Sequence, residues 1–291
     1  MILVFQLVQQ ISSEDFILNQ PLASPSLWNP AVSMGQPQTP ASKPGAFEIK
    51  FLIEESLLEP LISTLATKMQ ADPHADPKTG GYSVEGIYFE THDRDVFRRI
   101  PGYSRRKFRI RRYAGGPNIF LERKSKRKGI VTKRRVQIES SELDKILTGA
   151  YERPLDGMQE AGPSYETHKP PTIDWFTKRI DKLKLHPTLC IAYDRVAFLQ
   201  MDQQSPIRLT IDRGMRCCSL TDKQFPSQLA YRPFLGEKCV VEMKYRDAMP
   251  NAFREILEEF KLVSQPVSKF RNAIVVAGLA APIESPSAEG T

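Results

Sequence analysis

Basic side chains alternate with apolar ones in residues 107–113, which read Lys-Phe-Arg-Ile-Arg-Arg-Tyr. A period of two is typical of a β-strand, because successive side chains point to opposite faces of a sheet. Arg109 and Arg111 therefore share one face, while Phe108 and Ile110 share the other. Guanidinium groups donate paired hydrogen bonds to phosphate or carboxylate oxygens. A solvated basic face would have the same pattern, so both interpretations stay open for this strand alone.

The same alternation returns along the chain and predicts a set of strands that each have a charged or polar face and an apolar face. We expect eight strands, near residues 46–51, 82–91, 107–113, 119–125, 131–138, 189–199, 207–213 and 238–246. Like charges would repel each other in a dry core, whereas they can line a water-filled tunnel. Closure would also remove the exposed sheet edges. The pattern predicts an α+β fold: an eight-stranded antiparallel β-barrel tunnel with a polar, basic interior.

Helical segments are predicted where apolar residues recur at spacings of three and four. Such segments lie near residues 54–71, 96–97, 140–147, 173–183, 253–260 and 268–279. Their apolar stripes can cover the outer, apolar faces of the strands. We therefore expect the helices to pack outside the tunnel.

Four carboxylates interrupt the basic faces, namely Glu48, Glu122, Asp212 and Glu242. They are too few to neutralise the basic residues around them. Each could orient neighbouring cations through ion pairs or hold a divalent cation, which commonly shares its coordination shell with phosphate oxygens. Basic strands with one or two carboxylates match the needs of a polyphosphate tail bound with a metal.

Composition and charge set broader limits. The chain has 291 residues, of which 41% are hydrophobic and 26% charged, as in a soluble globular protein with a sizeable core. The net charge of +7 favours an anionic partner without choosing its class. The two tryptophans do not form a stacking platform on the basic strands, so no nucleic-acid partner is expected. The four cysteines form no CxxC pair or disulfide framework, which predicts reduced thiols and a cytoplasmic location.

Domain boundaries follow from the distribution of polar and apolar residues. Residues 1–44 are rich in Pro, Ser, Gln and Asn and are predicted to be a flexible extension, residues 45–281 the tunnel domain, and residues 282–291 a disordered tail. The apolar run at residues 1–8 lacks the basic start of a secretory signal and is shorter than the roughly 20 residues of a membrane helix. No transmembrane segment is expected, although association with a membrane partner stays open.

Eight short motifs, taken in order, resemble the VTC domain. This is the polyphosphate polymerase domain of the triphosphate tunnel metalloenzyme (CYTH-like) superfamily. The resemblance spans about residues 46–280. Each motif alone is weak because basic strands are common, whereas eight motifs in the family's order are specific. The motifs are Glu48-x-Lys50, Lys107-Phe108-Arg109-Ile110-Arg111-x-Tyr113, Leu121-Glu122-Arg123-Lys124, Lys133-Arg134-Arg135, Tyr193-x-Arg195-x-Ala197-Phe198, Arg208-x-Thr210-x-Asp212, Glu242-x-Lys244 and Ser268-Lys269-Phe270.

The resemblance implies a polymerase that transfers the γ-phosphoryl group of ATP to a growing polyphosphate chain. It implies that Glu242 binds Mn²⁺ or Mg²⁺, the alternative being an ion pair between Glu242 and a tunnel cation. The groups implied at the catalytic centre are Lys50, Arg109, Arg111, Lys124 and Lys133. Those implied to bind the remaining phosphates are Arg195, Arg208, Lys269, Tyr193 and Ser268.

Two positions depart from the family's pattern. Pro266 stands where relatives often carry a basic residue, three positions before Lys269. This difference supports the alternative of a non-catalytic subunit that binds polyphosphate or inositol phosphates. Ala46 stands where tunnel enzymes with a fuller acidic motif place another glutamate. This second difference argues against a triphosphatase or a class IV cyclase, although the triphosphatase remains an alternative.

Overall fold

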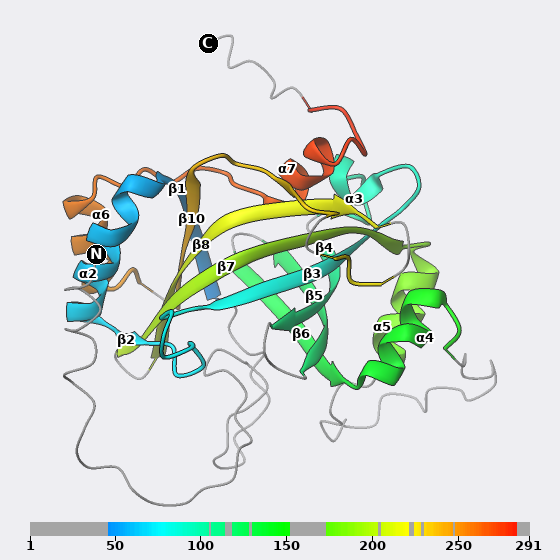
Figure 1. Ribbon diagram of the computed structural model, residues 1–291, viewed down its shortest axis with the longest axis horizontal. Helices are drawn as coiled ribbons and strands as arrows, with labels where there is room; N and C mark the ends of the chain where they lie inside the picture. Colours follow the sequence, from blue (N-terminus) through cyan, green and yellow to red (C-terminus); the bar gives the residue numbers. More distant parts are fainter. Residues whose placement is uncertain are drawn as a thin grey trace, which may run out of the picture. The chain divides into compact units, whose positions relative to one another are not determined.

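Ten strands form one antiparallel sheet in the part of the chain that the structure describes (Figure 1). This computed structural model describes residues 46–104, 106–113, 118–127, 130–151, 173–202, 205–220, 224–227, 230–246 and 248–283. The predicted extension at residues 1–44 lies outside these ranges, as does the end of the predicted tail. The strands are β1 (Ala46–Glu54), β2 (Gln70–Ala71), β3 (Tyr82–Glu90), β4 (Arg106–Tyr113), β5 (Ile119–Arg127), β6 (Ile130–Ile138), β7 (His186–Asp202), β8 (Ser205–Ser219), β9 (Arg232–Pro233) and β10 (Lys238–Tyr245).

Eight of these strands close into a ring. Their order is β7-β3-β4-β5-β6-β1-β10-β8, and β8 pairs again with β7. The seam between β1 and β6 is the shortest, with the residue pairs Ala46–Val131 and Phe47–Ile130. The short strands β2 and β9 are added to β7 and β8. The predicted fold, an antiparallel ring of eight strands with helices outside, is confirmed.

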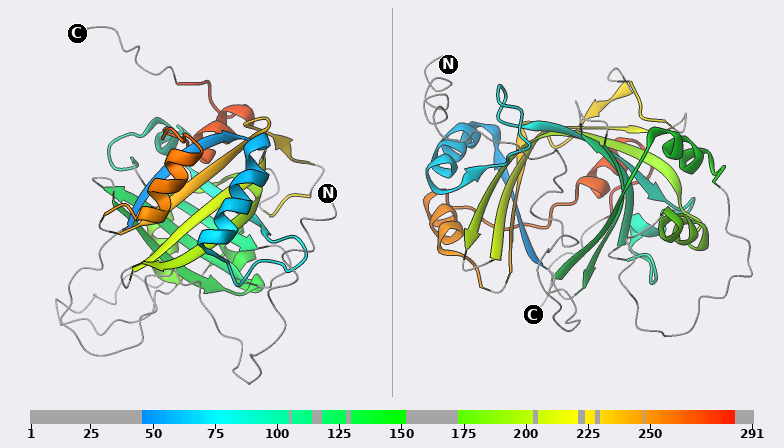
Figure 2. Two further views of the ribbon diagram at one scale, coloured as in Figure 1. Left: turned by 90° about the vertical axis from the view of Figure 1, so that its left-hand side faces the viewer. Right: turned by 90° about the horizontal axis from the view of Figure 1, so that it is seen from below.

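Helices cover the ring on two opposite outer sides (Figure 2). One pair, α2 (Leu58–Lys68) and α6 (Asn251–Glu259), packs side by side and is linked by a hydrogen bond from Lys68 Nζ to Glu255 Oε2. The other pair is α4 (Ser140–Thr148) and α5 (Ile173–Lys182). The remaining helices, α3 (Asp95–Arg98) and α7 (Lys269–Val276), contact each other.

The apolar faces of the strands pack outward beneath these helices. Under α2 and α6 the buried residues include Phe51, Leu209 and Met243 from three neighbouring strands. On the other side Phe176 of α5 is fully buried and meets the ring of Phe108 edge-on, with 5.7 Å between the ring centres. Burying such a side chain stabilises the fold by about 1.5–3 kcal/mol. The outer faces therefore supply much of the core, which leaves the inner face for charged side chains.

Several element boundaries differ from the predicted ones. β1 continues to Glu54, which pairs with Lys238 of β10, and a 3₁₀ turn (Glu55–Leu57) precedes α2. The helix therefore begins later than its acidic residues suggested. β7 and β8 extend over 17 and 15 residues because they pair with each other as a long hairpin. The last helix ends at Val276 rather than near residue 279.

Candidate functional site

The charged side chains of the strands share the inner face of the ring. Directly opposed residues of paired strands lie on the same face of a sheet. Arg109 opposes Tyr88 on one side and Glu122 on the other, and Glu122 opposes Arg135. Followed around the ring, this register defines an inner charged face composed of Glu48, Lys50, Lys107, Arg109, Arg111, Glu122, Lys124, Lys133, Arg135, Tyr193, Arg195, Arg208, Asp212, Glu242 and Lys244.

Glu122 is the centre of one ionic cluster and has no exposed surface. Its carboxylate lies 2.7 Å from Arg109 Nη2, 2.6 Å from Lys133 Nζ and 2.5 Å from Arg135 Nη2. Arg111 Nε is more distant, at 3.9 Å. Burial raises the pKa of Glu122, but the surrounding cations, Lys133 first, hold the pKa well below its usual range. Glu122 is thus an ionised group that orients the neighbouring cations, and its oxygens have little room for a metal.

Lys269, the first residue of α7, joins two further carboxylates. Its Nζ atom lies 2.6 Å from Asp212 Oδ2 and 3.0 Å from Glu242 Oε1. Arg195 donates two hydrogen bonds to the Asp212 carboxylate, of 2.6 and 2.8 Å. Burial raises the pKa of Asp212, whereas Arg195 and Lys269 outweigh that effect and lower the pKa to about 2. A helix therefore adds a cation to a lining that otherwise comes from strands.

Lys50 lies between two carboxylates. Its Nζ atom is 2.5 Å from Glu242 Oε1 and 3.3 Å from Glu48 Oε1. Lys244 approaches the same two carboxylates at 3.4 and 3.9 Å, and Lys124 Nζ lies 2.8 Å from Glu48 Oε2. Burial raises the pKa of Glu48, but the nearby lysines hold the pKa well below its usual range. Glu48 and Glu242 are thus a pair of ionised carboxylates that share the same lysine neighbours.

These two carboxylates are compatible with a divalent cation that also binds phosphate. Mg²⁺ commonly takes one or two carboxylates and completes its shell with substrate phosphates and water. Within the described ranges, no three Asp, Glu, His or Cys side chains gather into a metal-binding group. Glu242 and Glu48 therefore fit a metal shared with substrate better than a metal enclosed by protein ligands. In the structure Glu242 is also engaged in the ion pairs that were the alternative to metal binding.

Tyr193 holds two of the predicted arginines. Its Oη atom accepts hydrogen bonds from Nη2 of Arg111 at 3.0 Å and from Nη2 of Arg195 at 3.4 Å. Because both arginines donate to this oxygen, the hydroxyl hydrogen remains for an acceptor such as a phosphate oxygen. Tyr193 therefore both fixes the arginines and keeps one donor for a ligand.

Arg208 is held by two residues that sequence reasoning missed. Its Nη2 atom donates to Asp72 Oδ2 at 2.6 Å and to Tyr82 Oη at 2.8 Å. Asp72 lies between β2 and β3, where the sequence indicated only the end of a helix. No sequence signal marks a contact between residues 136 positions apart. The predicted role of Arg208 in binding phosphate stays a prediction.

Ser268 is the N-cap of α7, and its Oγ atom accepts hydrogen bonds from Arg271 N at 3.3 Å and from Lys107 Nζ at 3.1 Å. Lys107, Arg135 and Lys244 were not among the predicted site residues, although they lie on the same parity as those that were. Their positions in the alternating pattern of each strand would have been enough to predict that all three lie on this face. All predicted site residues on strands lie on the inner charged face.

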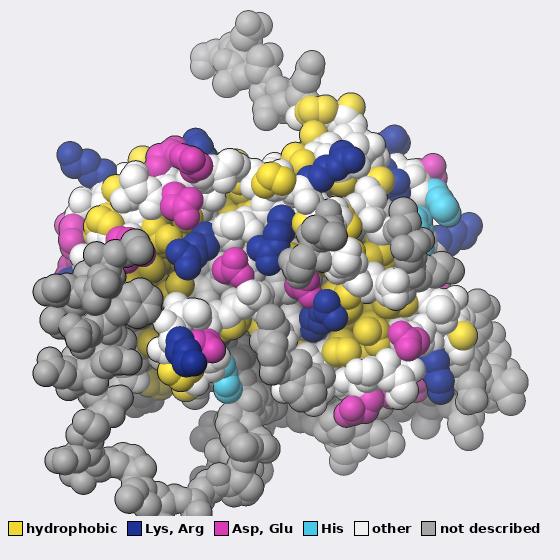
Figure 3. Space-filling view, viewed as in Figure 1, with side chains coloured by type: hydrophobic (Ala, Val, Ile, Leu, Met, Phe, Trp, Pro, Cys, Tyr) yellow, Lys and Arg dark blue, Asp and Glu magenta, His cyan; other side chains and the backbone are white. Residues whose placement is uncertain are grey.

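The outer surface differs in character from the inner face. On the face shown in Figure 3, basic and acidic side chains are interspersed. At the ends of β1 and β10 an exposed pair joins Lys238 Nζ to Glu54 Oε1 at 3.0 Å. The described side chains on the face in Figure 3 form no continuous basic stripe of the kind that binds a nucleic-acid backbone. Among the residues with described structure, no helix has the length and apolar character needed to cross a membrane.

Comparison with known proteins gives one family match. The family model described as VTC domain matches residues 46–277. No curated protein gives a significant match to the chain.

Two solved structures illustrate the structural similarities. A candidate adenylate cyclase from Bacillus halodurans is 16% identical, with a TM-score of 0.45 over 77% of this chain and 95% of that one. A candidate adenylyl cyclase from Hippeastrum, described as having a dominant triphosphatase activity, is 13% identical, with a TM-score of 0.44 over 80% and 96% of the two chains.

Proposed function

Because this chain belongs to the VTC domain family, we propose that it is an ATP–polyphosphate phosphotransferase. The proposed polymerase transfers the γ-phosphoryl group of ATP to a growing polyphosphate chain and releases ADP. One observation carries the proposal: strands from all around a closed ring, together with α7, direct cations toward a few buried carboxylates on a single inner face. A linear polyanion is a ligand that can meet such cations in succession.

The arginines suit phosphate because they are already oriented. Glu122 and Tyr193 fix the guanidinium groups of Arg109 and Arg111. Donors that are positioned before the ligand arrives need less reorganisation when negative charge develops on the transferred group. We assign Arg109 and Arg111 to the transferred phosphoryl group, and Lys124 and Lys133 to its neighbours on the same wall.

The remaining predicted groups extend the binding path. Arg195, Lys269 and Tyr193 form one contact network around Asp212, and they would bind successive phosphates of the chain. Arg208 and Ser268 lie outside that network and would bind further phosphates.

Phosphoryl transfer requires in-line positioning and cancellation of charge on the equatorial oxygens. It does not require a covalent protein nucleophile. Lys50 forms an ion pair with Glu242. When a phosphoryl group competes with this carboxylate for Lys50, the ammonium group can contact the reacting phosphoryl oxygens. The chain's own contribution is therefore orientation and fixed positive charge.

Glu242, with Glu48 beside it, would hold Mn²⁺ or Mg²⁺. When bound, such a cation supplies positive charge shared with phosphate oxygens. The two carboxylates already share Lys50 as a cationic neighbour, which supports this assignment. The metal assignment is tested through the metal dependence of a Glu242 variant.

We also propose that the protein works in a reducing compartment such as the cytoplasm. The four cysteines are free and buried, and Cys190 and Cys218 remain thiols although they oppose each other on β7 and β8. This supports reduced thiols rather than structural disulfides.

The deciding experiment incubates the purified chain with ATP and Mn²⁺ and measures ADP together with polyphosphate on a sizing gel. The proposal expects ADP and a ladder of polyphosphate, both absent with a β,γ-nonhydrolysable ATP analogue. Release of inorganic phosphate without chain growth would indicate a triphosphatase. Tight polyphosphate binding without turnover would indicate a binding subunit. Either result would overturn the polymerase assignment.

A further inference from the structure

Within the described residues Lys107 forms no ion pair with a carboxylate, in contrast to the other cations named above for the inner charged face. Each of the others lies within 2.5–3.9 Å of an Asp or Glu oxygen. The direct neighbour of Lys107 in the sheet register is Lys124, a second cation. A half-buried ammonium group without a counter-charge is unfavourable, and an anionic ligand beside it would remove that cost.

Ser268 completes a set of donors around this position. Its Oγ atom accepts from Lys107 Nζ at 3.1 Å and from Arg271 N at 3.3 Å. A hydroxyl oxygen has two acceptor sites and one hydrogen to donate. In the described ranges no acceptor is found for the hydrogen of Ser268. The ammonium group and the hydroxyl therefore offer only donors to a ligand, as an oxyanion requires.

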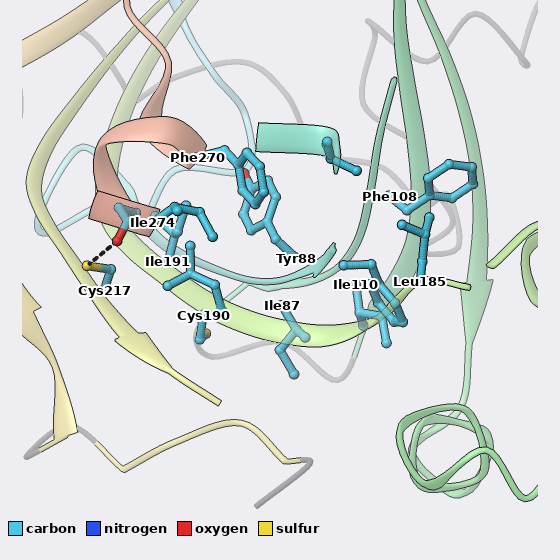
Figure 4. Packing of buried hydrophobic residues seen from close by; sticks show 14 of the residues in the cluster. Ile87, Tyr88, Phe108, Ile110, Leu185, Cys190, Ile191, Cys217, Phe270 and Ile274 are labelled. Atoms are coloured by element: carbon cyan, nitrogen blue, oxygen red, sulfur yellow. Dashed lines mark hydrogen bonds between the residues drawn. The ribbon is translucent and has the colours of Figure 1, made fainter. Parts of the chain in front are cut away.

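Helix α7 places an apolar surface next to Lys107. The ammonium group of Lys107 lies 5.5 Å from the centre of the Phe270 ring, and Phe270 stacks on Tyr88 with 5.5 Å between ring centres. Figure 4 shows Phe270 and Ile274 of α7 against Tyr88 and Ile191. Ile191 and Ile274 have no exposed surface. This apolar surface offers no cation to a further phosphate, so a polyphosphate chain at Lys107 gains nothing by extending along α7.

We propose that Lys107 and Ser268 form the position that binds the terminal phosphate of a linear polyphosphate chain. The inference rests on the proposed function, since it assumes that polyphosphate enters the ring. A terminal phosphate has more non-bridging oxygens and more negative charge than an internal one. It therefore matches a position that has two donors, no carboxylate and an apolar end. Lys107 acts here as a binding group for one end of the chain.

The charge of Lys107 should change when the phosphate arrives. Burial, followed by Lys50, Lys124 and Arg109, lowers the pKa of Lys107 to about 7, while Glu48 acts in the opposite direction. Ser268 and Phe270, which contact the amine from α7, carry no charge. A phosphate beside the amine favours the ammonium form. Binding at or above neutral pH should therefore take up protons at Lys107.

The test compares two ligands by calorimetry without ATP or metal. Linear tripolyphosphate has terminal phosphates, whereas cyclic trimetaphosphate has only internal ones. Lys107→Met should lower the affinity for the linear ligand by about tenfold or more, as expected for loss of a hydrogen bond to a charged group, and should change the affinity for the cyclic ligand little. Lys178→Met, at an exposed position on α5, removes the same charge and should change neither affinity.

A second variant separates a binding role from a structural one. Lys107→Arg should keep the affinity for tripolyphosphate but lose part of the proton uptake, because a guanidinium group stays charged. Proton uptake is obtained from binding enthalpies in buffers with different ionisation enthalpies. This variant decides the question if Lys107→Met does not fold.

The outcomes that overturn the inference are distinct. Equal losses of affinity for both ligands would mean that Lys107 contributes only general charge. An unchanged affinity of Lys107→Met for tripolyphosphate, with normal binding by the wild type, would refute the terminal position alone. A wild type that binds no tripolyphosphate would refute the proposed function together with the inference. Unchanged proton uptake in Lys107→Arg would also refute the inference that the terminal phosphate binds beside Lys107.

Discussion

Lys50 of β1 and Glu242 of β10 oppose each other directly in the sheet, and Lys50 Nζ lies 2.5 Å from Glu242 Oε1. Burial raises the pKa of Glu242, but Lys269 and Lys50 hold the pKa well below its usual range. The carboxylate is therefore ionised at neutral pH. A phosphate that enters the ring must compete with Glu242 for Lys50, so substrate binding and the state of this carboxylate are coupled.

Glu242→Gln should lower turnover by at least about 100-fold, the scale of losing one electrostatic group at a phosphoryl-transfer centre. It should also raise the Mn²⁺ concentration needed for half-maximal rate, because an amide oxygen binds a divalent cation more weakly than a carboxylate does. ADP release measured across a Mn²⁺ series checks both effects. An unchanged Mn²⁺ dependence would restrict Glu242 to its ion pairs with Lys50 and Lys269.

Arg109→Ala should lower turnover by about 10²–10³-fold while the fold is retained. Arg109 is one of several cations around Glu122, and Lys133 and Arg135 still neutralise that carboxylate in the variant. The matched control is Arg123→Ala, which removes a guanidinium group from the outward side of β5, opposite Phe108. The control should keep its turnover. An Arg109→Ala protein that has lost its cooperative unfolding would indicate a structural role instead.

Glu122→Gln should destabilise the protein by about 3–5 kcal/mol, because it leaves several buried cations without their shared counter-ion. For a domain of this size the melting temperature should fall by roughly 10 °C. Glu54→Gln, which affects an exposed pair with Lys238, should cost less than about 1 kcal/mol. Thermal unfolding of the two variants measures the difference. Tripolyphosphate should raise the melting temperature of Glu122→Gln more than that of the wild type, since it restores negative charge among the cations.

Asp212 should contribute to a loss of stability in acid. Its pKa is 3.8 in the unfolded chain and about 2 in the folded one, a lowered value that Arg195 and Lys269 produce against the effect of burial. The stabilisation is therefore complete above about pH 4 and is lost as the pH falls toward 2. Asp212→Asn should be less stable at neutral pH and show a shallower decline between pH 4 and 2. Denaturant unfolding at several pH values checks this, and parallel curves for both proteins would contradict it.

The alternation of charged and apolar residues along the sequence was sufficient to predict the ring of strands and most of the side chains that line it. Alternation around Arg109 and Arg111 predicted which side chains share a face, and the closed register extends this rule to every strand of the ring. The ionic partners could not be predicted, because they depend on strand order and register. Lys107 and Ser268 are 161 positions apart, and only the docking of α7 brings them together. Likewise, Asp72 reaches Arg208 only after the segment between β2 and β3 has folded against the ring.

Asp72→Asn should strengthen the binding of tripolyphosphate by about threefold to tenfold, the net scale of an ordinary hydrogen bond, because the asparagine oxygen still accepts from Arg208 but no longer carries a charge. In the wild type, Arg208 donates to Asp72 Oδ2 at 2.6 Å, so a phosphate must compete with a carboxylate for this guanidinium group. An asparagine keeps the shape and removes the charge. Calorimetric titration of both proteins at equal ionic strength measures the gain.

Asp76→Asn is the matched control for this effect, because it removes a charge from the same segment. The Asp76 carboxylate accepts hydrogen bonds from the nearby backbone amides of Lys78 and Thr79. If long-range charge alone limited binding, both variants would bind tripolyphosphate more tightly to a similar extent. A gain confined to Asp72→Asn locates the competition at Arg208. A loss of affinity in Asp72→Asn would contradict the prediction, since it would mean that Asp72 is needed to orient Arg208 toward the phosphate.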